Sequence, residues 1–398
     1  MEEYKEKVAV IGGGYAGVMA VARLAKQLKK QELILINNSP YFKERIRNHE
    51  IAADAFKNEL SMKKLIPPGC ILKEGTVTKI NPEQNLIEME GEEGRETLTY
   101  SYLILAAGSS AEMTSENTKF YSINSEFAAI QLQQELKKKQ NINAAVIGAG
   151  LSGIELTSEL SEKYKELTLH LFDSGEIGSQ FSPKGKYYIR KILQESGVIL
   201  HDNCRTKING NSLESDEGIS FAADIIIRTA GFQCRISDML SGVKVNENSQ
   251  IIVDSHLRSL THRNIFAAGD SAWIEGKSYQ GQRMSCAFAM PMGAHAADNI
   301  ARLLNGEDLK PFGFKFVTQC VSLGRKKGLI QFVTDDDRPL SKILTGKTGA
   351  LIKELVSRYT VWMLRLEVLF GFRLYTWPGK NTFTCESPNA AAADAIRI

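Results

Sequence analysis

Two glycine clusters with the same spacing are the residues in this 398-residue chain best suited to chemistry. They are Gly12, Gly14 and Gly17, and then Gly148, Gly150 and Gly153. A short apolar run comes directly before each cluster, as in a strand buried within a parallel sheet. Glycines at this spacing allow a tight turn, bring backbone amides close to a pyrophosphate and let the next helix pack on the strand. The pattern predicts two dinucleotide sites, and two such sites indicate electron transfer between bound cofactors.

The residue about 20 positions beyond each third glycine is expected to contact the ribose. Asp173 holds this position after the second cluster, whereas Asn37, followed by Asn38, holds it after the first. A carboxylate there favours the ribose hydroxyls of NADH and repels the 2′-phosphate of NADPH. Asn37 can still accept a hydrogen bond from a hydroxyl, but without charge assistance. The second cluster therefore predicts NADH in preference to NADPH.

The surrounding pattern predicts the elements that hold these residues. Apolar runs at 8–11, 32–36, 143–147 and 167–172 read as strands, and a helix with an apolar face follows each glycine cluster. The expected fold class is α/β, with two Rossmann-like dinucleotide-binding domains and a C-terminal α/β or helical extension.

Composition narrows the function. The chain has 49 basic and 46 acidic residues, a balance that argues against nucleic acid as a partner. Its six cysteines include no CxxC pair, so neither a dithiol motif nor a metal site is expected. The start of the chain lacks the pattern of a signal peptide, and no run of 18 uncharged apolar residues occurs. A cytoplasmic protein is the expectation.

The order of four motifs resembles the flavoproteins with two dinucleotide-binding domains. Between and after the glycine clusters come 102–108, ending in Ala-Ala-Gly, then 224–232 and the pair Gly269-Asp270. The resemblance implies FAD in a domain formed by 1–110 and 240–310. It also implies NAD(P)H in an inserted domain at 111–239, followed by a C-terminal domain at 311–398.

Three shorter segments resemble the type II NADH:quinone oxidoreductases. They are the aromatic-rich 41–46, Thr-Ala-Gly-Phe at 229–232 and the segment 316–324, which ends in Ser-Leu-Gly. This likeness implies hydride transfer from NADH to the flavin, with electrons then passed to a quinone.

The resemblance implies roles for individual residues. Asp270 is expected to accept from a ribityl hydroxyl of FAD, although Gly-Asp is also common in turns. A helix is expected to begin at Pro291, so that its first amides, at Met292 and Gly293, face the flavin ring. The expected cofactor-binding residues are Gly12, Gly14, Tyr15, Ala16, Gly17, Asn37, Asn38, Arg45, Ala107, Gly108, Gly148, Gly150, Gly153, Asp173, Gly231, Gly269, Asp270, Met292 and Gly293. The expected catalytic residues are Glu155, Pro291 and Met292.

Two of these residues keep a second interpretation. Glu155 is either a carboxylate near the nicotinamide or second substrate, or an acid favoured by the helix dipole. Arg45 either contacts an anion of the cofactor or substrate, or lies on a solvated helix face.

The likeness is incomplete at the acceptor end. The family's paired glutamines near the quinone are absent from 287–293, and Ala107 replaces a threonine. A small metabolite or a redox protein therefore remains an alternative acceptor. A protein that binds FAD and NADH as a sensor, with slow turnover, is the alternative from another class.

The segment 347–377 is apolar at helical spacing, with interleaved basic and aromatic residues. Such a helix can lie at a membrane interface, which would place the protein peripherally at the inner face of a membrane. The alternative is that its apolar face covers the flavin domain or a homodimer partner.

Overall fold

The computed structural model describes residues 5–109, 120–138, 141–209, 212–216, 218, 220–231, 233–234, 236–276, 282–370 and 372–379. Phe232, the loop residues 277–281 and the segment 380–398, on which parts of the predictions fall, lie outside this range. Two sheets with parallel strands, each holding a strand that leads through a glycine cluster into a helix, confirm the predicted α/β fold class.

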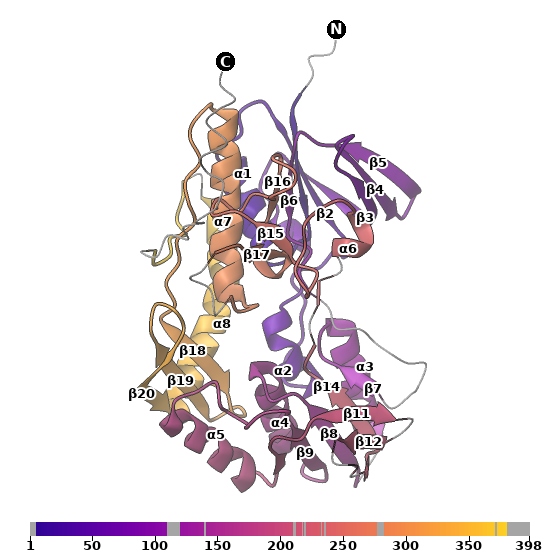
Figure 1. The fold of residues 1–398 in the computed structure, drawn as a ribbon, viewed down its shortest axis with the longest axis vertical. Coiled ribbons are helices and arrows are strands. Elements are labelled where there is room, and N and C mark those ends of the chain that lie inside the picture. Colours follow the sequence, from indigo (N-terminus) through magenta and orange to yellow (C-terminus); the bar gives the residue numbers. More distant parts are fainter. Residues whose placement is uncertain are drawn as a thin grey trace.

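The first sheet, in the upper half of Figure 1, contains the first glycine cluster. Within the described residues its strand order is β16-β6-β1-β2-β3-β4-β5, parallel as far as β3 and antiparallel beyond. Its strands are β1 (Lys7–Ile11), β2 (Glu32–Asn37), β3 (Cys70–Asn81), β4 (Leu86–Gly91), β5 (Gly94–Thr99), β6 (Tyr102–Leu105) and β16 (Ile265–Ala267). The late strand β16 pairs with β6, so the chain returns to this sheet after the second glycine cluster.

The second sheet, in the lower half of Figure 1, has the order β10-β9-β8-β14-β7 in the described part of the chain, and its strands are all parallel. Its strands are β7 (Phe120–Ser122), β8 (Asn143–Ile147), β9 (Thr168–Phe172), β10 (Ile199–His201) and β14 (Ile225–Arg228). The smaller pairings join β11 (Thr206–Asn209), β12 (Ser212–Ser215) and β13 (Ser220–Ala222), and separately β15 (Ile251–Val253) and β17 (Ala272–Ile274).

Helices pack on both sheets. They are α1 (Tyr15–Ala25), α2 (Asn48–Ala52), α3 (Glu126–Lys138), α4 (Leu151–Lys163), α5 (Pro183–Glu195), α6 (Ile236–Met239), α7 (Cys286–Leu304) and α8 (Gly346–Leu369), with 3-10 turns at Arg45–Arg47 (η1), Met62–Leu65 (η2) and Gly269–Ser271 (η3). Helix α1 ends at Ala25, and Lys26 is its C-cap.

The C-terminal region joins the two halves. An antiparallel sheet of β18 (Thr318–Ser322), β19 (Gly328–Val333) and β20 (Pro339–Thr345) leads directly into α8. Val321 and Leu329 belong to the apolar core of the second sheet, whereas Val361 and Leu364 belong to the core of the first. The extension is therefore packed into both cores rather than appended to either.

Candidate dinucleotide and acceptor site

The first glycine turn leaves space where its middle glycine faces outward. A Cβ on Gly12, whose φ is +100°, would lie 2.3 Å from the Ala106 carbonyl oxygen, and a Cβ on Gly17 would lie 1.8 Å from the Gly12 oxygen. These contacts require glycine. A Cβ on Gly14 would meet no atom within 4 Å. The turn is thus closed on the side of the sheet and open in front of Gly14, as a bound pyrophosphate needs.

Asn37 closes this turn instead of leaving its side chain free. Its Oδ1 accepts from the Gly13 amide at 2.8 Å, and its Nδ2 donates to the Ser39 oxygen at 2.7 Å. Asn38 beside it is exposed. The amide therefore replaces the expected acid as an acceptor for the turn itself.

Residues distant in sequence meet beside the first turn. Asp270, which follows β16, accepts from the Ser109 hydroxyl at 2.7 Å, with Arg45 Nη1 3.7 Å from the same oxygen. The Gly108 amide donates to Ser271 Oγ at 3.0 Å. The structure brings these residues together because β1, β6 and β16 are parallel neighbours whose carboxyl ends share one edge.

Two predicted site residues in the same region pack against other parts of the protein. A Cβ on Gly269 would lie 3.2 Å from the Ala16 Cβ, so η3 contacts the start of α1. Tyr15 is buried and meets the Phe42 ring edge-on, with their centroids 5.1 Å apart.

The prediction that a helix begins at Pro291 is wrong. Helix α7 begins at Cys286, after Ser285, and Pro291 lies inside it. The Ala289 amide already donates to the Ser285 oxygen at 2.9 Å. An interior proline removes one donor and crowds the carbonyl four residues earlier. The early turns of α7 persist with Phe288 packed edge-on against Phe314, their ring centroids 5.2 Å apart.

The amides of Met292 and Gly293 are consequently not at a helix start. Met292 is fully buried, and a Cβ on Gly293 would lie 2.1 Å from the Ala16 oxygen. Gly293 thus allows α7 to approach α1 closely.

The second glycine turn repeats the backbone of the first. Gly148 has φ +102°, a Cβ on Gly153 would lie 1.8 Å from the Gly148 oxygen, and a Cβ on Gly150 would meet nothing within 4 Å. Asp173 Oδ2 accepts from the Ala149 amide at 2.6 Å, and its Oδ1 accepts from Gly175 at 2.8 Å. Here a carboxylate does what Asn37 does in the first turn.

Gly231 follows β14 and has φ +80°, with the Arg228 guanidinium 2.8 Å from where its Cβ would lie. Gly148 lies against the same segment, since its Cβ would approach the Ala230 Cβ at 2.6 Å. The predicted residues 148–153, Asp173 and Gly231 thus surround one turn.

Glu155 on α4 is buried at the junction of four elements. Its Oε1 is 3.0 Å from Lys353 Nζ of α8 and accepts from the Ser322 amide of β18 at 3.0 Å. Its Oε2 lies 3.6 Å from His49 Nδ1 of α2. The carboxylate therefore does more than favour a helix N-terminus: it connects α4 with the C-terminal region.

Burial and charge oppose each other in this cluster. Burial alone would raise the pKa of Glu155, but Lys353, His49 and the Ser322 amide outweigh it and hold the pKa below its usual value. Burial would likewise lower the pKa of Lys353, yet Glu155 raises it above the usual value. Burial lowers the pKa of His49. The pair at neutral pH is an ammonium facing a carboxylate, with a neutral imidazole beside them.

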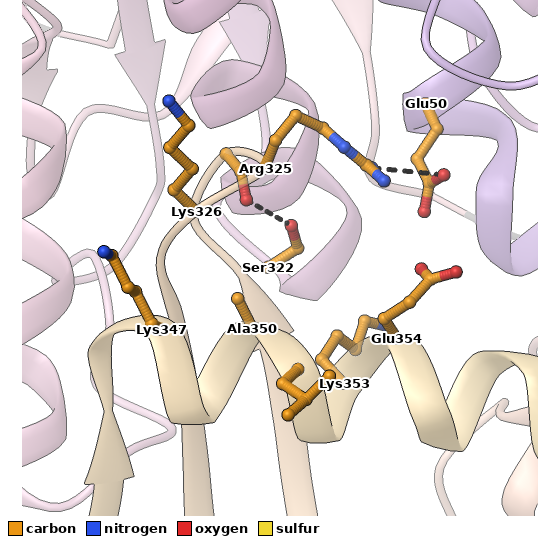
Figure 2. Close-up of a pocket in the computed structure, with 10 residues that line it drawn as sticks. Glu50, Ser322, Arg325, Lys326, Lys347, Ala350, Lys353 and Glu354 are labelled. Atoms are coloured by element: carbon orange, nitrogen blue, oxygen red, sulfur yellow. Dashed lines mark hydrogen bonds and ion pairs between the residues drawn. The ribbon is translucent and has the colours of Figure 1, made fainter.

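A cavity of about 460 Å³ reaches this cluster from outside. Figure 2 shows its walls, formed by the turn after β18, the first turns of α8 and Glu50 of α2. Arg325 pairs with Glu50 at 3.2 Å and with Glu159 at 3.3 Å, and Ser322 Oγ donates to Glu159 at 3.2 Å. Burial, opposed by Arg325, raises the pKa of Glu159 to about 7.

Sequence reasoning did not identify Lys353, His49, Ser322 or Arg325 as part of this site. A signal was available on α4, where Glu155, Glu159 and Glu162 recur at four and three residues and therefore share one face. Two of them, Glu155 and Glu159, are buried, and buried acids require cationic or hydrogen-bonding partners. The sequence does not show where those partners come from.

Helix α8 buries one face and exposes another. Leu351, Leu355, Tyr359 and Trp362 are 60, 56, 48 and 63 % exposed, while Leu364 on the other side is fully buried. No helix in the described part of the chain is long and apolar enough to cross a membrane. We call residues 351, 355, 359 and 362 the apolar stripe of α8.

Comparison with known proteins identifies relatives. A family model described as pyridine nucleotide-disulphide oxidoreductase matches residues 6–296. The chain is 27% identical to ferroptosis suppressor protein 1 of Xenopus laevis, covering 83% of this chain and 89% of that protein. It is 26% identical to a type II NADH:quinone oxidoreductase of Staphylococcus epidermidis, covering 92% and 97%.

A solved structure has the same fold. NDH2 from Plasmodium falciparum, in complex with NADH, superimposes with a TM-score of 0.76 at 15% identity, covering 93% of this chain and 98% of that chain.

Proposed function

The chain belongs to the pyridine nucleotide-disulphide oxidoreductase family, and from this membership we propose that it is an FAD-dependent enzyme that oxidises NADH and reduces a quinone. The family uses a flavin and a nicotinamide nucleotide. The assignment of FAD to the first glycine turn and NADH to the second is part of the proposal, as are the domain limits 1–110 with 240–310, 111–239 and 311–398. The observation that carries it is the pair of glycine turns, each with open space at its middle glycine.

The residues beside each turn fit the proposed cofactors. In front of Gly14, the Asp270 carboxylate offers acceptors for the hydroxyls of the flavin side chain, and Arg45 offers a cation for a phosphate. In front of Gly150, Asp173 places a negative charge where the adenosine ribose of NADH would bind, which disfavours the extra phosphate of NADPH. Bound flavin would supply the hydride acceptor and the electron relay between nicotinamide and quinone.

Glu155 and Lys353 are suited to proton handling at the acceptor side. Reduction of a quinone to a quinol takes up protons as well as electrons. Lys353 holds a proton next to Glu155 and lines the 460 Å³ cavity, from which water can restore a proton that has been donated. Ser322 and His49 fix Glu155, so the ammonium keeps its position.

The relatives' names support a quinone as the acceptor, because one of them is a type II NADH:quinone oxidoreductase. The apolar stripe of α8 supports contact with the membrane in which quinones dissolve. We propose a peripheral position at the inner face of the membrane, with the stripe lying in the interface.

The decisive experiment is an anaerobic titration of the purified protein with NADH, followed by its absorbance spectrum. We expect the bands of bound flavin, bleached by one equivalent of NADH and restored by a soluble quinone. Absence of bleaching would rule out the enzyme in favour of a nucleotide-binding sensor. Bleaching without reoxidation by quinone would point to a metabolite or redox-protein acceptor.

A variant tests the proton role. Lys353→Met should lower kcat with quinone by about 100-fold, within the range for a positioned acid, while NADH still bleaches the flavin. Lys353→Arg should keep a cation opposite Glu155 without restoring the rate, because a guanidinium does not release its proton. Equal losses in bleaching and in quinone turnover would assign Lys353 a structural role only.

A further inference from the structure

The turn between β18 and β19 is held rigidly by α4. The Leu323 amide donates to the Lys327 oxygen at 2.9 Å, and the Arg325 amide donates to Glu162 Oε2 at 2.7 Å. Gly324 has φ +82° and lies so close to Glu162 that a Cβ would meet the carboxylate at 2.0 Å. The backbone of this turn is therefore held against α4.

Two consecutive cations on the turn have opposite environments. Arg325 points inward, where Glu50 and Glu159 neutralise it. In Figure 2, Lys326 points the other way, toward the side of the cavity where Lys347 of α8 lies, and both lysines line the cavity. We call this side the mouth of the cavity. Within the described residues, no hydrogen bond or ion pair reaches the ammonium of either lysine.

The other charges of the cavity are already matched. Glu354 pairs with Arg47 at 3.0 Å, and Lys353 pairs with Glu155. Two unmatched positive charges at the mouth therefore remain, and they will attract an anion.

The mouth is continuous with the apolar stripe. Leu351 lines the cavity and is the first residue of the stripe, and Lys347 precedes it by one helical turn. Leu355 and Tyr359 continue the same face at intervals of four residues. An anion bound at the mouth would thus sit at the end of a surface that prefers a hydrocarbon environment.

We propose that Lys326 and Lys347 form a site for the anionic headgroup of a membrane phospholipid, with the adjoining stripe in contact with its hydrocarbon. The site sets the orientation of α8 on an anionic bilayer, so that the cavity leading to Lys353 faces the lipid surface. The inference rests on the membrane contact proposed above and adds the headgroup chemistry to it. A juxtamembrane lysine contributes about 1 kcal/mol on an anionic surface.

The test is sedimentation with vesicles of phosphatidylcholine alone and with vesicles that also contain phosphatidylglycerol, whose charge attracts basic segments. Lys326→Gln with Lys347→Gln should weaken binding to the anionic vesicles about 30-fold, which corresponds to about 2 kcal/mol for two lysines. Binding to neutral vesicles should stay unchanged.

A matched control separates this site from general charge. Lys79→Gln with Arg95→Gln removes two exposed cations from β3 and β5, at the far edge of the first sheet, and should change binding by less than about 3-fold. Equal weakening by both double variants would overturn the proposal in favour of unspecific attraction. Inorganic phosphate, titrated without vesicles at constant ionic strength, should bind the wild-type protein no more tightly than the double glutamine variant. Phosphate binding that requires both lysines would assign them to a free phosphate ion and overturn the lipid assignment.

Vesicle binding and NADH oxidation report separately on the headgroup site, the membrane contact and the enzyme activity. Wild-type protein that binds neither vesicle would refute the membrane contact itself. Equal binding of wild-type protein to both vesicles would refute only the headgroup site. NADH oxidation with a soluble quinone reports on the enzyme independently, and the double glutamine variant should retain it.

Discussion

The two glycine turns share a backbone but differ in the side chains around them. The conformations of Gly12 and Gly148 differ by only 2° in φ, and both middle glycines face open space. Yet the amide of Asn37 accepts the hydrogen bond from the first turn, whereas the carboxylate of Asp173 accepts it from the second. In both turns the amide of the second residue, Gly13 or Ala149, needs a hydrogen-bond acceptor. Either a neutral or a charged acceptor meets this need, so its charge can differ between the two nucleotide sites.

The helices after the turns differ in a complementary way. Residues 136 positions apart correspond, so Met19 and Arg23 of α1 match Glu155 and Glu159 of α4. Lys26, the C-cap of α1, matches Glu162. Arg23 and Lys26 lie 3.3 and 2.8 Å from Glu367 near the end of α8. The acids of α4 instead hold Lys353 and the turn that carries Arg325. Helix α1 thus contacts the C-terminal region through cations, and α4 contacts it through anions.

The largest expected effect comes from filling each open space in turn. Gly14 and Gly150 have φ of −79° and −64°, which valine can adopt, so Gly14→Val and Gly150→Val should fold. We expect Gly14→Val to purify without flavin. Gly150→Val should keep its flavin while the KM for NADH rises about 100-fold, as for a displaced substrate. The reverse pattern in flavin content and KM would mean that the two turns bind the opposite nucleotides.

The contact of Arg23 and Lys26 with α8 is tested by Glu367→Gln. Glu367 is fully buried against Arg23 and Lys26, so the substitution leaves both cations unmatched. We expect the free energy of unfolding in urea to fall by about 3–5 kcal/mol. The control Glu307→Gln breaks an exposed pair with Arg302 and should cost less than about 1 kcal/mol. Similar costs would show that the buried cluster adds nothing beyond a surface pair.

The buried acid Glu159 of α4 predicts that the stability of the protein depends on pH. Burial raises the pKa of Glu159 from 4.5 to about 7, so folding takes up a proton between these two pH values. The wild-type protein should therefore lose stability from this group as the pH rises from 4.5 to 7. Glu159→Gln removes the loss, so relative to wild type it should gain about 1–3 kcal/mol in unfolding free energy between pH 5 and pH 8.

The exposed Glu83→Gln serves as its control and should follow the wild-type curve. A constant difference between Glu159→Gln and wild type at all pH values would contradict the raised pKa.

The smallest effect is expected from exchanging the two acceptors. Asp173→Asn makes the second turn resemble the first and should raise the KM for NADH about 10-fold, with less discrimination against NADPH, as for loss of one charge-assisted bond. Asn37→Asp keeps an acceptor for the Gly13 amide but loses the donor to Ser39. Its flavin content, measured by absorbance, should change by less than about 3-fold. A larger change in Asn37→Asp would show that Asn37 touches the ribose as well as the turn.

Local patterns predicted most of the nucleotide-binding framework. The strands β1, β2, β8 and β9 begin or end within one residue of the apolar runs, because a buried parallel strand followed by glycine is readable from neighbouring residues. The start of α7 was not readable, since Pro291 resembles a helix start while Ser285, six residues earlier, provides it.

The ion cluster at Glu155 could not be predicted from the sequence alone. Its partners Ser322 and Lys353 lie 167 and 198 residues further along the chain. Their approach depends on β18 packing against α4 and on α8 contacting both α4 and α1, which no local pattern encodes.

Helix α8 also has a mechanical consequence. Helix α8 has 24 residues, and within it Lys353 binds Glu155 of α4 while Glu367 binds Arg23 of α1. The two attachment points are 14 residues apart, or about 21 Å along the helix. A helix bound to both α4 and α1 restrains bending between the halves that contain the two sheets. The two contacts have opposite charges on α8. If the helix docked in the reverse direction, Lys353 would face Arg23 and Lys26, and Glu367 would face Glu155, so like charges would meet. Helix α8 can therefore dock in only one direction.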